Sequence, residues 1–80
     1  MPVRVLFLGP LSDAFGAGET EMAAPLTWAT LMEQLPMEVT AALGDDRVHV
    51  AHEAKVLTDK TSLLAEDGDE VALLPPVSGG

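Results

Sequence analysis

The chain has 80 residues, of which 13 are acidic and 4 are basic, so its formal net charge at neutral pH is −9. Hydrophobic residues make up 48% of the sequence and charged residues 21%, a balance typical of one small globular domain and not of a disordered chain. The negative charge argues against a nucleic-acid partner, because every phosphate would repel it. It is consistent with a basic protein surface as the partner, and an acidic surface that only keeps the protein in solution is an equal alternative.

The first expected element is a strand over Val3 to Gly9, which is rich in β-branched and aromatic residues. Since the side chains of a strand alternate between its two faces, Val5 and Phe7 lie on one face and Leu6 and Leu8 on the other. Both faces of this strand are therefore apolar, and a domain of this size does not have enough chain to cover both of them.

A short helix, a weak strand and a main helix are expected next. Pro10 to Phe15 suits a short helix because glycines follow it, and Glu19 to Ala23 alternates like an edge strand. Thr27 is the expected N-cap of the main helix, whose apolar stripe ends with Leu35 before Pro36 interrupts the pattern.

A further helical segment and two strands are predicted in the second half of the chain. The helical segment covers Met37 to Leu43, and the strands cover Arg47 to Glu53 and Lys55 to Thr58. Leu63 and Leu64 are interpreted as a short buried turn.

The last strand, Glu70 to Leu74, follows an Asp67-Gly68-Asp69 turn and again carries apolar residues on both faces. Strands outnumber helices, so the main helix most simply packs across one face of a mixed sheet. A right-handed crossover then lays the 47–53 strand or the last strand beside the first strand, in parallel. The element order predicts an α+β fold, a β-grasp or ubiquitin-like roll, as a single domain over residues 1–80.

The closing residues, Pro75-Pro76-Val77-Ser78-Gly79-Gly80, predict a flexible tail over residues 75–80. The prolines cannot donate backbone hydrogen bonds, so the sheet must end there. A diglycine end has no side chains and can carry the α-carboxylate of Gly80 into a site too narrow for them. A frayed terminus is the plain alternative.

Leu8, Leu74 and Leu6 are the expected partner-docking residues. In the predicted sheet they face away from the main helix and lie beside the tail, so we interpret them as an exposed apolar patch that binds another protein. Coverage of these leucines by surface loops is the alternative.

No metal site, bound cofactor or catalytic constellation is predicted on the chain. His49, His52 and Glu53 suggest metal ligands, but histidines three positions apart in a strand face opposite sides of the sheet. The serines lack a Gly-x-Ser-x-Gly setting, and Gly16-Ala17-Gly18 lacks the spacing and the lysine of a phosphate loop. We therefore interpret the chain as a carrier or a binding module.

Cysteine is absent, which excludes disulfides, thiolate metal sites and a cysteine nucleophile on this chain. If the protein handles sulfur, the sulfur must be carried on something other than a thiol side chain. The sequence has no signal-peptide pattern, and no apolar run approaches membrane-spanning length. We expect a cytoplasmic protein without a membrane partner.

The run from Asp67 to Gly80, together with Val5-Leu6-Phe7-Leu8 and the total length, resembles the small, sulfur-carrier subunit of molybdopterin synthase, the MoaD family. The resemblance implies a β-grasp fold. It also implies that an E1-like adenylyltransferase adenylates Gly80 at the expense of ATP, and that the product is converted to a thiocarboxylate. The subunit itself is not catalytic.

The resemblance further implies that residues Pro75 to Gly79 enter the active site of the large subunit of the synthase, with Leu8 and Leu74 as docking contacts. There the sulfur passes to cyclic pyranopterin monophosphate during molybdenum cofactor biosynthesis. In this family two small subunits flank a dimer of large ones, which makes a heterotetramer. The family commonly has aromatic residues at the positions of Leu8, Leu73 and Leu74, so the patch is less bulky here.

Three other readings remain open at this point. The first is a related ubiquitin-like carrier that serves thiazole synthesis or tRNA thiolation. The second is a protein modifier that is conjugated to lysines through Gly80. The third is an interaction module whose diglycine end is incidental.

Overall fold

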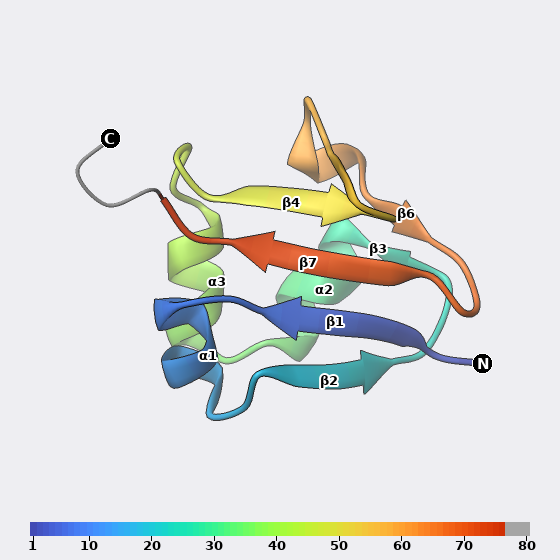
Figure 1. Cartoon of the computed structure of the whole chain (residues 1–80), viewed down its shortest axis with the longest axis horizontal. Helices are drawn as coiled ribbons and strands as arrows, with labels where there is room; N and C mark the ends of the chain where they lie inside the picture. The colour runs from blue at the N-terminus through green and yellow to red at the C-terminus, as the bar shows by residue number, and fades with distance from the viewer. Residues whose placement is uncertain (77–80) are drawn as a thin grey trace.

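Five strands form a mixed sheet in the computed structural model, which describes residues 1–76 (Figure 1). The strand order is β2-β1-β7-β4-β5, and a second sheet pairs β3 with β6. The elements in chain order are β1 (Val3–Phe7), α1 (Pro10–Phe15), β2 (Glu19–Met22), β3 (Leu26–Thr27), α2 (Trp28–Gln34), α3 (Met37–Leu43), β4 (His49–His52), β5 (Lys55–Val56), the 3₁₀ turn η1 (Lys60–Ser62), β6 (Leu64–Ala65) and β7 (Glu70–Leu74).

The first and last strands lie side by side at the centre of the large sheet. β1 and β7 run parallel, with Val5 opposite Val71 and Phe7 opposite Leu73. β2 flanks β1 and β4 flanks β7, both antiparallel. Of the two strands predicted as possible parallel partners of the first, the last strand pairs with it and the 47–53 strand does not; the arrangement is the β-grasp roll expected from the element order.

Local signals define the helix ends. α1 begins at Pro10 and ends at Gly16, whose φ of 93° is one that glycine adopts without steric cost. The Thr27 hydroxyl accepts a hydrogen bond from the N–H of Thr30 at 3.2 Å, which confirms the predicted N-cap of α2. α2 ends before Pro36, because a residue preceding proline is disfavoured in helical conformation.

The core lies between the large sheet and the helices; in Figure 1, α2 lies behind the sheet and α1 lies beyond one end of it. One face of each central strand is fully buried, as the alternation in the sequence predicts: Val5 and Val71 have no exposed surface. The core side chains are Val3, Val5, Phe7, Leu11, Met22, Leu26, Leu31, Leu35, Val39, Leu43, Val48, Val50, Leu63, Ala65, Val71 and Leu73. None of the helices in residues 1–76 has both the length and the apolar character needed to cross a membrane.

Several predictions on the second half of the chain require correction. The sequence predicts one main helix, whereas α2 and α3 are equally long, with seven residues each. Leu63 is buried as predicted, but Leu64 is 52% exposed, so the buried turn is wrong for that residue. Leu64 instead lies in β6, which pairs with β3 in a small sheet that the sequence analysis missed. A strand of two residues is too short to show a period in the sequence.

Candidate functional site

The three leucines predicted to dock a partner lie on the same face of the large sheet, the face opposite the helices. Leu6 is opposite Ala72 in the register of β1 and β7, and both are half-buried. Leu8 follows directly after β1, where its N–H donates to the carbonyl of Leu73 at 3.3 Å, and it is 42% exposed. Leu74, the last residue of β7, is half-buried and opposite His49 of β4.

The neighbouring strands extend this apolar surface across the sheet. Ala72 is opposite Ala51 of β4, and Ala51 is opposite Val56 of β5, which is 58% exposed. Because residues opposite one another in a ladder share a face, these side chains continue the row that begins at Leu6. We use the term apolar patch for the partly and fully exposed members of this surface: Leu6, Leu8, Val56, Ala72 and Leu74.

A charged cluster borders the apolar patch at the end of the sheet that is farther from the tail. The guanidinium of Arg4 donates to Glu19 at 2.7 Å and lies 3.6 Å from the carboxylate of Glu70. The hydrogen bond from Arg4 lowers the pKa of Glu19, and the same bond raises the pKa of Arg4. Glu21 is opposite Arg4 in the register with β2. Three carboxylates surround one guanidinium, so this edge of the patch has a net negative charge.

The tail begins beside the exposed end of the apolar patch. β7 ends at Leu74, directly before the two prolines, so the predicted end of the sheet is confirmed. Pro75 is half-buried and Pro76 is exposed. The other residues predicted for the tail, Val77, Ser78, Gly79 and Gly80, lie outside the described residues.

The two histidines lie on opposite faces of β4, as predicted from their spacing. His49 is opposite Leu74 on the face of the apolar patch, whereas His52 is opposite Val71 on the core face. His52 Nε2 lies 2.8 Å from Asp69 Oδ2, which also accepts the N–H of Glu66 at 2.9 Å. These contacts, first that with Glu66, lower the pKa of Asp69. Within residues 1–76, no three potential metal-ligating side chains converge.

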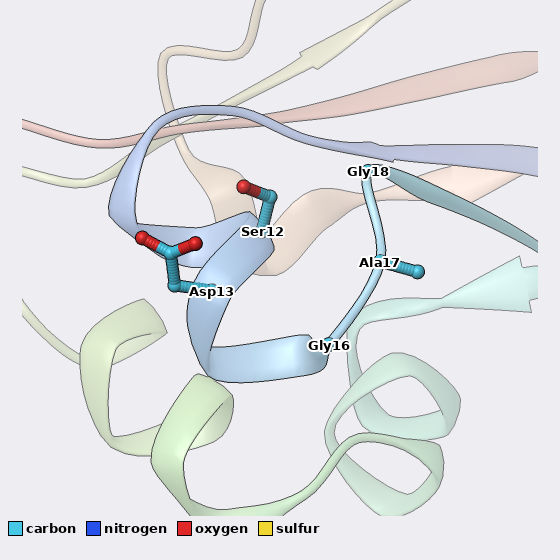
Figure 2. A pocket seen from close by; sticks show the side chains of 5 residues that line it. All are labelled: Ser12, Asp13, Gly16, Ala17 and Gly18. Atoms are coloured by element: carbon cyan, nitrogen blue, oxygen red, sulfur yellow. The ribbon is translucent and has the colours of Figure 1, made fainter.

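A shallow pocket of about 320 Å³ lies between α1 and the start of β2 and is lined by Ser12, Asp13, Gly16, Ala17 and Gly18 (Figure 2). The Ser12 hydroxyl in it already donates to the carbonyl of Gly9 at 2.8 Å. A second pocket, of about 270 Å³, includes Lys60, whose ammonium donates to the carbonyls of Asp45 and Val48 at 2.6 and 2.9 Å. Ser12 and Lys60 thus hold the local backbone in place.

Solved structures share this architecture over the whole chain. The HVO 2177 protein of Haloferax volcanii superimposes with a TM-score of 0.75 at 19% identity, covering 100% of this chain and 87% of that one. SAMP1 from the same organism gives 0.72 at 20% identity, with 100% of both chains covered. A protein–protein complex of subunits 1 and 2 of molybdopterin-converting factor from Helicobacter pylori contains a chain that gives 0.69 at 26% identity, again with 100% of both chains covered.

These likenesses and the strand order define a β-grasp domain of the ubiquitin-like class. The sequence specifies the class further, since residues 5–80 match the model of the ThiS family. The chain therefore belongs to the ThiS family of ubiquitin-like sulfur carriers, and the sequence-based prediction of such a carrier is confirmed. No curated protein matches the chain.

Proposed function

We propose that the chain is the sulfur-carrier subunit of a molybdopterin synthase and binds the large subunit through the apolar patch. The observation that carries this proposal is the position of the patch, where exposed Leu8 and half-buried Leu74 lie at the origin of the tail. Full-length similarity at 26% identity to a chain in the complex of the two converting-factor subunits supports a large-subunit partner. By analogy, two copies of this chain flank a dimer of large subunits.

The carrier chemistry takes place at the α-carboxylate of Gly80. A carboxylate resists nucleophilic attack because it is already anionic, so an E1-like adenylyltransferase first joins it to the AMP portion of ATP and releases pyrophosphate. A sulfur donor then displaces AMP and leaves a thiocarboxylate. Since the chain has no cysteine, the sulfur travels on this terminus and on no thiol side chain.

The tail from Pro75 to Gly79 carries the thiocarboxylate into the active site of the large subunit. There the sulfur passes to cyclic pyranopterin monophosphate, and the carrier returns to its carboxylate form. The large subunit and the activating enzyme supply the catalytic groups, and the chain supplies the acyl group and the apolar patch. We propose the cytoplasm as the compartment, because the activation consumes ATP.

A protein modifier is the second candidate function. Its support is the similarity to small archaeal modifier protein 1 from Methanosarcina acetivorans, with a TM-score of 0.72 at 22% identity and 98% of this chain and 95% of that one covered. In that case the adenylated Gly80 is transferred to lysine amines of target proteins. Activation at Gly80 is common to both candidates, and only the acceptor differs.

Mass spectrometry of the C-terminal peptide tests the carrier chemistry. The protein is purified from its native cells, and the peptide that ends at Gly80 is expected to be heavier by the difference between one sulfur and one oxygen atom. This peptide contains no methionine, so oxidation does not imitate the shift. Isopeptide-linked adducts in place of the thiocarboxylate would favour the modifier. A carboxylate that stays unmodified when ATP, activating enzyme and sulfur donor are supplied would refute both.

A further inference from the structure

The turn between β1 and α1 has a backbone conformation that requires glycine. Gly9 has φ 55° and ψ −133°, close to the values for the first central residue of a type II′ turn. The N–H of Leu11 donates to the carbonyl of Leu8 at 3.2 Å and closes this turn. Any L-residue other than glycine is strained at such a φ.

Hydrogen bonds on both sides keep this turn from shifting. The carbonyl of Gly9 accepts the N–H of Ser12 at 3.0 Å and its hydroxyl at 2.8 Å. On the strand side, the N–H of Leu8 donates to the carbonyl of Leu73. The turn is therefore fixed to both α1 and β7.

Pro75, the first residue of the tail, packs directly against this turn. A Cβ atom added to Gly9 would lie 3.2 Å from Cγ of Pro75, closer than ordinary van der Waals contact. The ring of Pro75 fixes its own φ, so the contact restrains the direction of the backbone where it leaves the sheet. The close approach depends on the missing side chain of Gly9.

We propose that Gly9 is a positioning residue for the carrier reaction, because it sets the direction in which the tail leaves the sheet at Pro75. This inference rests on the proposed carrier function and extends it to a residue that the tail chemistry does not touch. The apolar patch determines how tightly a partner binds. The contact between Gly9 and Pro75 determines how often the terminus of the bound carrier meets the reacting group.

A double-mutant cycle with Gly9→Ala and Pro75→Ala tests the inference. The added methyl group displaces Pro75, so Gly9→Ala is expected to slow single-turnover adenylation by the activating enzyme about 10- to 100-fold, as misplacement of a reacting group does. The dissociation constant of the complex between the carrier and the activating enzyme is expected to stay unchanged. In the Pro75→Ala background no ring Cγ remains to collide, so Gly9→Ala has no further effect on the rate.

Gly68→Ala is the matched control. Gly68 also has a positive φ, 84°, but a Cβ added there meets no atom within 4 Å. It carries the same kind of backbone strain without any contact with the tail, so adenylation is expected at the wild-type rate. If Gly9→Ala slows adenylation no more than Gly68→Ala does, or equally in both Pro75 backgrounds, the inference is wrong.

If Gly9→Ala does not fold, Ser12→Ala takes its place as the test variant. It removes the hydroxyl that donates to the carbonyl of Gly9. We again expect slower adenylation than in wild type, and we expect this effect to disappear in the Pro75→Ala background. A wild-type rate in this variant would overturn the inference.

Sulfur transfer to the pterin separates this inference from the proposed function. A wild-type carrier that is adenylated but gives no sulfur to cyclic pyranopterin monophosphate refutes the molybdopterin assignment, while the adenylation cycle still decides the role of Gly9. A wild-type carrier that is not adenylated refutes both.

Discussion

The carboxylate of Asp45 stabilises the loop between α3 and β4. Its carboxylate accepts the backbone N–H of Arg47 at 2.8 Å and the guanidinium of the same residue at 2.9 Å. Its backbone carbonyl accepts the ammonium of Lys60. The hydrogen bonds from Arg47, with that of the side chain first, lower the pKa of Asp45 from 3.8 to about 2.

This lowered pKa predicts a loss of stability in acid. A carboxyl group whose pKa is lower in the folded state stabilises the fold fully above its ordinary pKa of 3.8, and the stabilisation is lost as the pH falls through about 2. We expect urea unfolding to show that wild type is more stable than Asp45→Asn at pH 7. The difference should shrink between about pH 4 and pH 2, in the range set by the two pKa values. A difference that does not change with pH would contradict the assigned role of Asp45.

Adjacent residues of β7 lie on opposite faces of the sheet. Leu73 has no exposed surface and packs in the core, whereas Leu74 is half-buried on the opposite face, in the apolar patch. Stability and the proposed partner binding therefore depend on alternate positions of one strand. Substitutions at the two leucines separate these properties.

Leu73→Ala is expected to lower the free energy of unfolding by about 2–5 kcal/mol, because it leaves a cavity in a packed core. Leu74→Asp is expected to weaken partner binding by about tenfold or more, since it places a charge in the proposed apolar interface. Chemical denaturation and calorimetric titration with the large subunit measure the two effects. Leu64→Asp on β6, an exposed site outside the large sheet, is the matched control and should bind as wild type does.

The alternation in the first and last strands was sufficient to predict much of the fold. It assigned the buried and open faces of β1 and β7. The crossover rule left the 47–53 strand and the last strand as possible parallel partners of β1, and only the structure selects β7. The small sheet of β3 and β6 could not be predicted, because two-residue strands carry no periodic signal. The ion pair of Arg4 with Glu19 and the hydrogen bond between His52 and Asp69 depend on the pairing of distant segments, and no local sequence pattern indicates them.

The contact of Gly9 with Pro75 was missed for a related reason. The sequence Gly9-Pro10 signals a turn, but nothing near it in the chain indicates that a proline from the far end of the sequence will pack there. Only the parallel pairing of β1 and β7 brings the two residues together. The proposed role of residues 77–80 rests on the diglycine end and on the family resemblance, and it stays a prediction.

At the scale of the whole molecule, electrostatic attraction should govern how fast partners meet. The net charge of −9 favours encounter with a basic surface, and salt screens such attraction over about 10 Å at an ionic strength of 0.1 M.

Stopped-flow measurements with the large subunit should show an association rate that falls about tenfold or more between low and physiological salt. The dissociation rate should change much less, because the contact proposed for the large subunit is mostly apolar. Glu38→Gln, at an exposed position on α3, is a single-charge control expected to alter the salt dependence only slightly. An association rate that is flat with ionic strength would exclude steering by charge.

The central position of β7 has a consequence for how the protein is made. Until residues 70–74 have left the ribosome, β1 has no partner on one side, β4 has none towards the centre, and the core lacks Val71 and Leu73. Pairing the two strands also closes a loop that spans most of the chain, which makes folding slow compared with that of a helical bundle of similar size. We therefore expect the domain to fold only after residues 70–74 have emerged from the ribosome. A nascent chain that is interrupted before residue 70 presents no completed apolar patch, so unfinished copies are not expected to compete for the proposed large-subunit partner.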